Sequence, residues 1–212
     1  MTTKKRNKVF DYRALRLLIG LIAFSIPFVV SFLSSSSLSS ISASYHTEAR
    51  DAFVGMLFIV SAFLWAYNGH SLKEALASKA ASLAALFVAI FPTSCDHCET
   101  NIESITHYVA AFIFFSILAY FCFVSFRQHI KGLKGKKGLR SKIYFVCGLI
   151  MVGCMLIIFV DEFILPDATM KSLNVTFWGE AIALGAFGVA WIVAGKYISL
   201  IVDKDEALQL FG

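Results

Sequence analysis

The distribution of lysine and arginine is the feature that most constrains the fold of this chain. Six apolar segments divide the sequence, and 17 of the 19 basic residues lie in alternate gaps around them. Basic residues gather on the cytoplasmic side of multi-pass membrane proteins. The pattern therefore predicts a membrane protein with both termini in the cytoplasm (N-in/C-in). The two basic residues left for the opposite, outer side are Arg50 and Lys171.

Composition supports the same class. The chain is 58% hydrophobic and 16% charged, whereas soluble domains carry roughly 25% charged residues. A span needs about 20 apolar residues, so six spans and their loops use all 212 residues. We expect a single all-α transmembrane domain over residues 1–212, because lipid cannot satisfy the backbone of an open strand edge.

The expected spans follow the apolar runs of the sequence. The predicted bundle of six transmembrane helices comprises Leu15–Leu33, Ala52–Tyr67, Leu76–Ile90, Ile105–Phe126, Ile143–Ile164 and Phe177–Ile198.

Three of these spans have open alternatives. Asn68–His70 and Ser78–Lys79 interrupt the second and third spans, and a re-entrant hairpin is the alternative for this pair. The basic, apolar and small-residue order around the first span is also typical of a secretory signal peptide. Its apolar run is longer than in such peptides, so we expect this span to be retained.

Two loops differ sharply in composition. The serine-rich stretch Ser34–Ser44 predicts a flexible outer loop, and Lys131–Lys142 predicts a solvated cytoplasmic loop. The basic loop is expected to contact anionic lipid headgroups, so the expected partners are the bilayer and these headgroups. Nucleic acid is not an expected partner, because topology accounts for the pI of about 9.0. Oligomeric state stays open.

The expected topology leaves an excess of acids on the outer side. Nine acidic residues face two basic ones there, and such a surface attracts cations. The acids are Glu48, Asp51, Asp96, Glu99, Glu103, Asp161, Glu162, Asp167 and Glu180.

Ionisable residues from four spans are expected at similar depth below the outer surface. Asp51, His107, Asp161 and Glu180 form this set, with Arg50 as their natural ion-pair partner. Buried ionisable groups in spans usually pair or line a water-filled cavity. The alternatives are a helix N-cap for Asp51, an interfacial position for Asp161 and a single hydrogen bond for His107.

A second candidate cluster follows Pro92. Cys95, His97 and Cys98 lie in the segment Cys95-Asp96-His97-Cys98-Glu99. A local Cys95–Cys98 disulfide is the favoured interpretation outside the cytoplasm. A zinc or copper site with His46 or His107 as a further ligand is the second, and a redox-active pair is the third. No cofactor is predicted firmly, and zinc and copper are the two candidates.

Three stretches carry a resemblance to known families. They are SISASYHTEARDAFVGMLFIVSAFLWAYNGH from Ser40, LFVAIFPT from Leu86 and FWGEAIALGAFGVAWIVAGK from Phe177. Together they resemble bacterial multi-pass membrane proteins grouped loosely with DUF998 and the Frag1/DRAM/Sfk1-like proteins, which implies no activity. Ser42, His46 and Asp51 also resemble part of the zinc site of alkaline-ceramidase-like hydrolases, but the last span lacks that family's histidines.

The leading functional prediction is a non-enzymatic protein of the plasma (bacterial inner) membrane. It would bind or transport a small cation or solute through an outward-facing acidic and histidine pocket. The runner-up is a metal-dependent intramembrane hydrolase at the outer leaflet, with a metal-bound water and Glu180 as general base. A structural or sensory membrane subunit is third. The common nucleotide-binding and hydrolase motifs are absent from the sequence.

Overall fold

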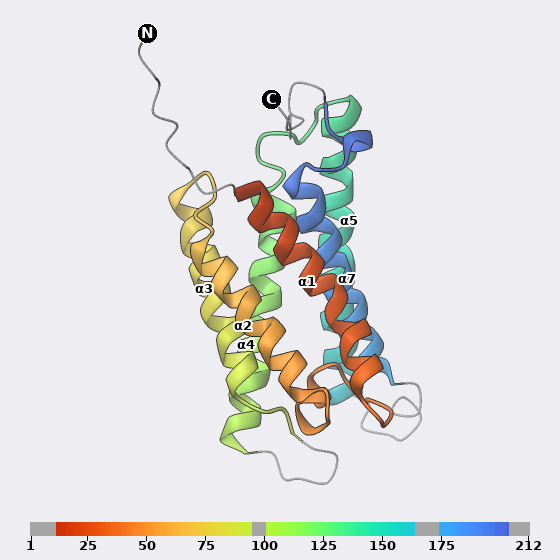
Figure 1. Cartoon of the computed structure of the whole chain (residues 1–212). Helices are drawn as coiled ribbons and strands as arrows, with labels where there is room; N and C mark the ends of the chain where they lie inside the picture. Colours follow the sequence, from red (N-terminus) through yellow and green to blue (C-terminus); the bar gives the residue numbers. More distant parts are fainter. Residues whose placement is uncertain (1–11, 95–100, 164–173, 204–212) are drawn as a thin grey trace.

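The computed structural model describes residues 12–94, 101–163 and 174–203. Within these ranges all regular secondary structure is helical, and the long helices run antiparallel along one another (Figure 1). The long helices are α1 (Tyr12–Leu33), α2 (Arg50–Ala66), α3 (Leu72–Ile90), α4 (Ile102–Tyr120), α5 (Gly135–Phe163) and α7 (Val175–Gly195). Shorter elements are 3-10 helices at Ser42–His46 and Ser199–Ile201, and a π-helix at Phe121–Ser125 that continues α4.

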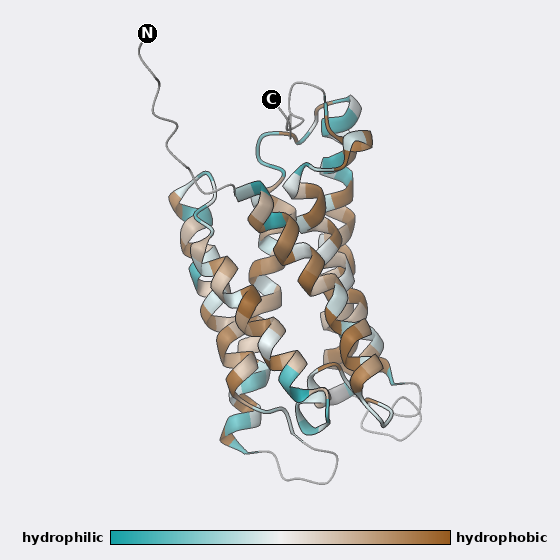
Figure 2. Cartoon of the chain, in the orientation of Figure 1, coloured by the Kyte–Doolittle hydropathy of each residue, from teal (hydrophilic) through white to brown (hydrophobic). Residues whose placement is uncertain are grey.

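Four of the predicted spans have the length and apolar composition needed to cross a membrane. They correspond to α1, α4 with its π-helical extension, α5 and α7. α2 has 17 residues, and α3 carries Lys73, Glu74 and Lys79 in its first half. In all six long helices apolar residues predominate along the length, and polar residues gather toward the ends (Figure 2).

The interruption expected at Ser78–Lys79 does not occur. α3 begins at Leu72, where the Ser71 side chain caps the helix by accepting a hydrogen bond from the Glu74 N–H at 3.2 Å. Ser78 lies inside the helix, and its hydroxyl donates to the Leu64 carbonyl at 2.6 Å. A serine that bonds a neighbouring helix in this way does not break its own helix.

The prediction of a basic loop over residues 131–142 is also wrong for the second half of this stretch. α5 begins at Gly135, so the later basic residues of this stretch are helical. The Lys136 ammonium donates to the Ser199 and Val202 carbonyls at 2.8 and 2.9 Å, and a guanidinium nitrogen of Arg140 donates to the Ile201 carbonyl at 2.9 Å. These carbonyls replace water as partners, so the charges do not require an extended solvated loop.

The two ends of the bundle carry different connections. α1 begins and α7 finishes at one end, which we call the amino end, together with the α2–α3 turn and the α4–α5 connection (Figure 1). The connection between α1 and α2 lies at the other end, which we call the far end. The gaps rich in lysine and arginine therefore share the amino end.

Glycines allow α1 and α7 to approach closely. A Cβ atom on Gly188 would lie 2.8 Å from the Gly20 carbonyl oxygen, and one on Gly20 would lie 2.7 Å from the Gly188 oxygen. α1 and α5 both pack chiefly on α7, whereas α2 and α4 pack chiefly on α3. The bundle thus consists of an α1–α7–α5 group and an α2–α3–α4 group, with less contact between the groups.

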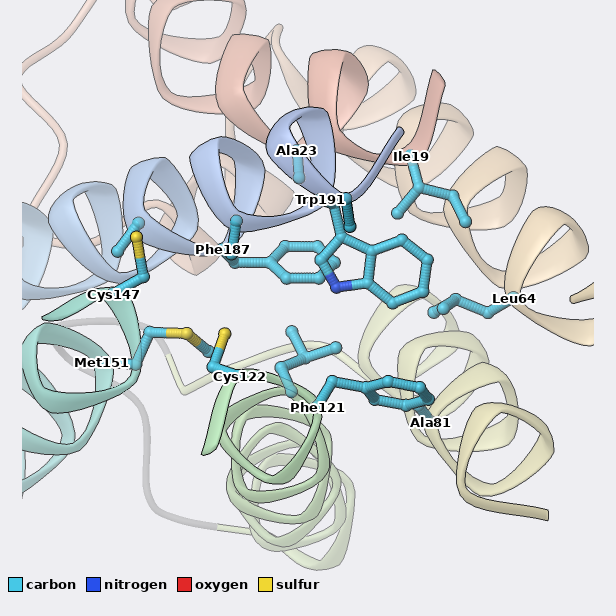
Figure 3. Packing of buried hydrophobic residues seen from close by; sticks show 14 of the residues in the cluster. Ile19, Ala23, Leu64, Ala81, Phe121, Cys122, Cys147, Met151, Phe187 and Trp191 are labelled. Carbon is cyan, nitrogen blue, oxygen red and sulfur yellow. The ribbon is translucent and has the colours of Figure 1, made fainter. Parts of the chain in front are cut away.

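An aromatic cluster fills the space between these groups toward the amino end. The fully buried Trp191 of α7 lies at its centre. Its ring centroid is 5.4 Å from those of Tyr67 and Phe121 and 5.5 Å from that of Phe187. Figure 3 shows Trp191 and Phe187 of α7 close to Phe121, with Cys122, Cys147 and Met151 beside them. The free thiols of Cys122, Cys147 and Cys154 are buried, as expected for small apolar residues.

The α2–α3 pair is joined by reciprocal serine hydrogen bonds. The Ser61 hydroxyl donates to the Ser82 carbonyl at 2.9 Å, and the Ser82 hydroxyl donates to the Ser61 carbonyl at 2.7 Å. Hydroxyls of this kind are the polar contacts that join helices within a bilayer.

Replacing Gly188 with alanine should destabilise the bundle. The new Cβ would meet the backbone of α1 at 2.8 Å, and such overpacking costs about 1–3 kcal/mol. Gly185→Ala is the matched control, because no atom lies within 4 Å of a Cβ at that position of the same helix. Thermal unfolding in detergent should show a lower midpoint for Gly188→Ala alone. Equal midpoints would contradict the close contact of α1 and α7.

Candidate functional site

Glu180 lies in the second turn of α7, with its carboxylate turned toward the segment that follows α1. The Ser42 backbone N–H donates to one carboxylate oxygen at 3.0 Å, and the Ser42 hydroxyl donates to the other at 2.9 Å. A single residue therefore supplies donors to both oxygens. These hydrogen bonds offset part of the cost of placing a carboxyl group among apolar residues of a helix that is long and apolar enough to cross a membrane.

A small cavity borders this carboxylate inside the bundle. Residues of α1, α2, α3, α4 and α7 surround it, including Ile26, Phe53 and Phe114. Its volume is about 40 Å³, which is enough space for water. Glu180 and Ser42 supply its polar lining, so any polar occupant would be held at this edge.

His107 lies on α4, one helical turn from Ala111, which also lines the cavity. Its ring is buried, and Nδ1 is 2.8 Å from the Phe91 carbonyl oxygen. Because a carbonyl can only accept, Nδ1 carries the proton in this contact and Nε2 is the acceptor of the neutral ring. Among the described residues, no group bonds Nε2.

Asp161 is buried between α5 and α7 rather than pointing outward as an interfacial residue. The Thr176 hydroxyl donates to its Oδ2 atom at 3.3 Å. Its Oδ1 atom has no hydrogen-bond partner within the described ranges. Asp161 thus joins two helices of the same group.

Arg50 and Asp51 lie on the surface at the far end. The Arg50 guanidinium stacks on the Tyr45 ring, 4.5 Å from its centroid, and donates to the Tyr45 hydroxyl at 3.0 Å. Asp51 is exposed in the first turn of α2, and the N-cap position belongs to Ala49. In the described part of the chain, Arg50 forms no ion pair with any of the four other candidates.

The five pocket candidates therefore occupy three places. Glu180 and His107 belong to the surroundings of the central cavity, Asp161 lies between α5 and α7, and Arg50 and Asp51 border a surface hollow. The five side chains do not meet in one pocket, and Arg50 does not act as their ion-pair partner among the described residues. Depth along the helices was predictable, but the direction of each side chain around its helix was not.

The Cys-His cluster lies outside the described residues, which applies to Cys95, His97 and Cys98 alike. His46, one suggested further ligand, is exposed, with Nε2 2.8 Å from the Thr93 carbonyl oxygen. Over residues 12–94, 101–163 and 174–203, no three His, Cys, Asp or Glu side chains gather as a metal site would require.

Sequence reasoning missed the partner of Glu180, because the serine-rich stretch was interpreted as flexible. The structure folds Ser42–His46 into a 3-10 helix and buries Ser42 and Ser44. The Ser44 hydroxyl donates to the Ile41 carbonyl at 2.6 Å. The sequence signal was the spacing of Ile41, Ser44 and Ala49, which places small or apolar residues toward the bundle.

A second polar cluster at the amino end was also missed. Arg16 was counted only as a cytoplasmic charge, yet it is buried between the two helix groups. Its guanidinium donates twice to the Tyr67 hydroxyl and once to the Ala194 carbonyl of α7 at 3.2 Å. Nη2 also lies 3.3 Å from Nδ1 of His70.

Glu74 continues this cluster on α3. Its buried carboxylate accepts from the His70 backbone N–H at 2.7 Å and from the Gln128 side chain at 2.9 Å. Nδ1 of His70 is 3.6 Å from the same carboxylate. The i, i+4 spacing of His70 and Glu74 was the signal available in the sequence.

Three comparisons with known proteins found no relative of this chain. No family model, curated protein or solved structure matches it.

Replacing Tyr67 with phenylalanine should destabilise the bundle, since it removes the hydroxyl that accepts two hydrogen bonds from Arg16. Leaving a buried donor without its acceptor costs about 1–3 kcal/mol, and more for a charged group. Tyr12→Phe is the control, because its hydroxyl only accepts from the exposed Asn68 side chain at 3.3 Å. Thermal unfolding should show the larger loss for Tyr67→Phe. The reverse order would contradict the importance of this contact.

Proposed function

We propose that this chain is a six-span protein of the bacterial plasma membrane with both termini in the cytoplasm, and that it binds a proton or a small cation at Glu180. The distribution of basic residues supports this orientation. Within the described residues, every lysine and arginine except Arg50 lies in or beside a segment at the amino end, the side that the positive-inside rule assigns to the cytoplasm.

The charges of α3 are compatible with a spanning role for α2 and α3. Glu74 is in the first turn of α3 and is bonded within the amino-end cluster. The Lys79 ammonium reaches back to the Trp65 carbonyl at 2.8 Å and the Asn68 side chain at 2.7 Å. Lysines near span ends commonly extend their ammonium toward the interface in this way. The rest of α3, from Ala80 to Ile90, carries no charged residue.

The carboxylate of Glu180 beside a polar-edged cavity is the observation that carries the functional proposal. A carboxylate and a serine hydroxyl are oxygen ligands of the kind that hard cations prefer. Both carboxylate oxygens of Glu180 already accept hydrogen bonds from Ser42. A proton or cation would therefore compete with Ser42 for these oxygens, which links binding to the position of the α1–α2 connection.

The surroundings favour a positively charged ligand. The proposed outer side has nine acids and two bases, an excess that raises the local concentration of cations. His107 lies one helical turn from the cavity residue Ala111, and its buried Nε2 carries a lone pair that no described group engages. Ser42 and Glu180 line the cavity, and the aromatic cluster around Trp191 lies nearer the amino end.

Replacing Glu180 with glutamine should abolish cation- or proton-dependent flux in liposomes containing the purified protein, because the carboxamide removes the negative charge. Flux is measured with a trapped pH dye under imposed Na⁺, K⁺ and H⁺ gradients. Glu48→Gln is the control. Glu48 is exposed on the same connection, and its own backbone N–H and that of Ser35 lower the pKa of its carboxyl, so it is ionised at neutral pH. Normal flux in the Glu180 variant would contradict the proposal.

Topology is tested with one introduced cysteine at a time in a Cys95→Ser/Cys98→Ser background, in which the remaining thiols of Cys122, Cys147 and Cys154 are buried. A membrane-impermeant maleimide should label Ser36→Cys in intact cells, because Ser36 is exposed in the α1–α2 connection. Lys73→Cys and Lys134→Cys, both at exposed positions, should react only after the cells are opened. Labelling of Lys73→Cys in intact cells would show that α2 and α3 do not both cross the membrane.

A further inference from the structure

The surface hollow beside Arg50 is separate from the cavity at Glu180. Its volume is about 610 Å³, and it is open to the surroundings of the bundle. This lies within the range of about 300–1,000 Å³ typical of small-molecule sites. Tyr45, Arg50 and Asp51 form its polar part at the far end, and Val54, Gly55 and Phe58 form its wall along α2, opposite the last residues of α3.

The hollow is polar at one end and apolar along the rest of its length. Phe58 follows Arg50 by eight residues, which corresponds to about 12 Å along the helix axis at 1.5 Å per residue. The polar part therefore lies at a helix terminus, and the apolar part extends from it toward the middle of the bundle. A lipid in a bilayer has the same order, with its headgroup at the interface and its acyl chains parallel to the helices.

The apolar wall is accessible and lacks a side chain at its centre. Phe58 is 43% exposed and Ile90 is 48% exposed. Gly55 has open space where a side chain would stand, with no atom within 4 Å of an ideal Cβ. A larger residue there would extend into the hollow.

The charges at the polar part are oriented but not paired with each other. The Tyr45 hydroxyl donates to the Ile90 carbonyl at 3.2 Å and accepts from Arg50 at 3.0 Å, so Tyr45 joins Arg50 to the end of α3. A guanidinium has five N–H donors, and this hydrogen bond uses one. In the described part of the chain, no hydrogen bond or ion pair engages the Asp51 carboxylate.

We propose that this hollow binds one phospholipid with a phosphoethanolamine headgroup. Arg50 would bind the phosphate, Asp51 would bind the ammonium group, and one acyl chain would lie along Val54, Gly55 and Phe58. The zwitterionic headgroup complements adjacent positive and negative side chains. An anionic lipid without an amine engages Arg50 but leaves Asp51 beside added negative charge, and diacylglycerol engages neither.

The test is native mass spectrometry of the full chain in detergent with equal amounts of phosphatidylethanolamine, phosphatidylglycerol or diacylglycerol of the same acyl composition. One phosphatidylethanolamine should remain bound per chain, at least about tenfold more tightly than either other lipid. Arg50→Gln and Asp51→Asn should each remove most of this preference. Their thermal midpoints, measured in parallel, should match the wild type, because both side chains are exposed.

The acyl part is tested with Gly55→Leu against Gly153→Leu. Both glycines have open space around an ideal Cβ, and Gly153 lies on α5, away from the hollow. Gly55→Leu should lower phosphatidylethanolamine retention about tenfold or more, while Gly153→Leu should leave it unchanged.

Three results would overturn the assignment. Equal retention of all three lipids would remove the headgroup argument, and an Asp51→Asn variant with unchanged preference would remove the role of the carboxylate. Equal effects of the two leucine substitutions would show that the lipid binds elsewhere. None of these results affects the flux assay at Glu180, so the two proposals fail independently.

Discussion

Polar contacts between helices determine how this bundle is joined, because hydrocarbon removes most of the apolar driving force for helix association. Two such contacts lie near opposite ends. At the amino end, Arg16 of α1 reaches Tyr67 beyond α2 and the Ala194 carbonyl of α7. At the far end, Ser42 in the α1–α2 connection binds Glu180 of α7. Each contact joins a helix of the α1–α7–α5 group to a residue just before or just after α2, which belongs to the other group.

Within each group, different kinds of contact hold neighbouring helices together. Glycine contacts bring α1 and α7 together, and serine hydroxyls join α2 to α3. Such contacts hold helices at fixed distances within each group. The boundary between the groups contains the small cavity and the aromatic cluster around Trp191. A ligand that changes the Ser42–Glu180 contact would act on this boundary, where contact is less extensive.

Much of the helical architecture was predictable from hydropathy, since the segments that became α1, α4, α5 and α7 were all expected. The predicted first residues of α3 and α5 were several residues too late in the sequence, because Lys73 and Lys136 were interpreted as loop residues. The Ser71 cap of α3 is local, whereas the carbonyl partners of Lys136 lie at Ser199 and Val202, in a distant part of the chain. The unusual position of Glu180 could be predicted from its apolar neighbours. Its partner Ser42 could not, because that contact spans 138 residues of sequence.

The Arg50 pairing shows a second limit of sequence reasoning. Arg50 and Asp51 are adjacent, and adjacency suggested an ion pair. Successive residues on a helix point about 100° apart, given 3.6 residues per turn, so their side chains can find separate partners. Arg50 stacks on Tyr45, five residues earlier. Such a contact depends on how the 3-10 helix meets α2, which composition does not encode.

The close contact of Gly20 with Gly188 has a consequence for biogenesis. The first described helix, α1, packs chiefly on α7, the last of the long helices. These two packed helices are therefore separated by nearly the whole described chain. During synthesis, α2, α3 and α4 can associate as each emerges, whereas α1 has to wait for α7. The Ala194 carbonyl that accepts from Arg16 is synthesised late as well, so the bundle can be completed only after α7 has been made.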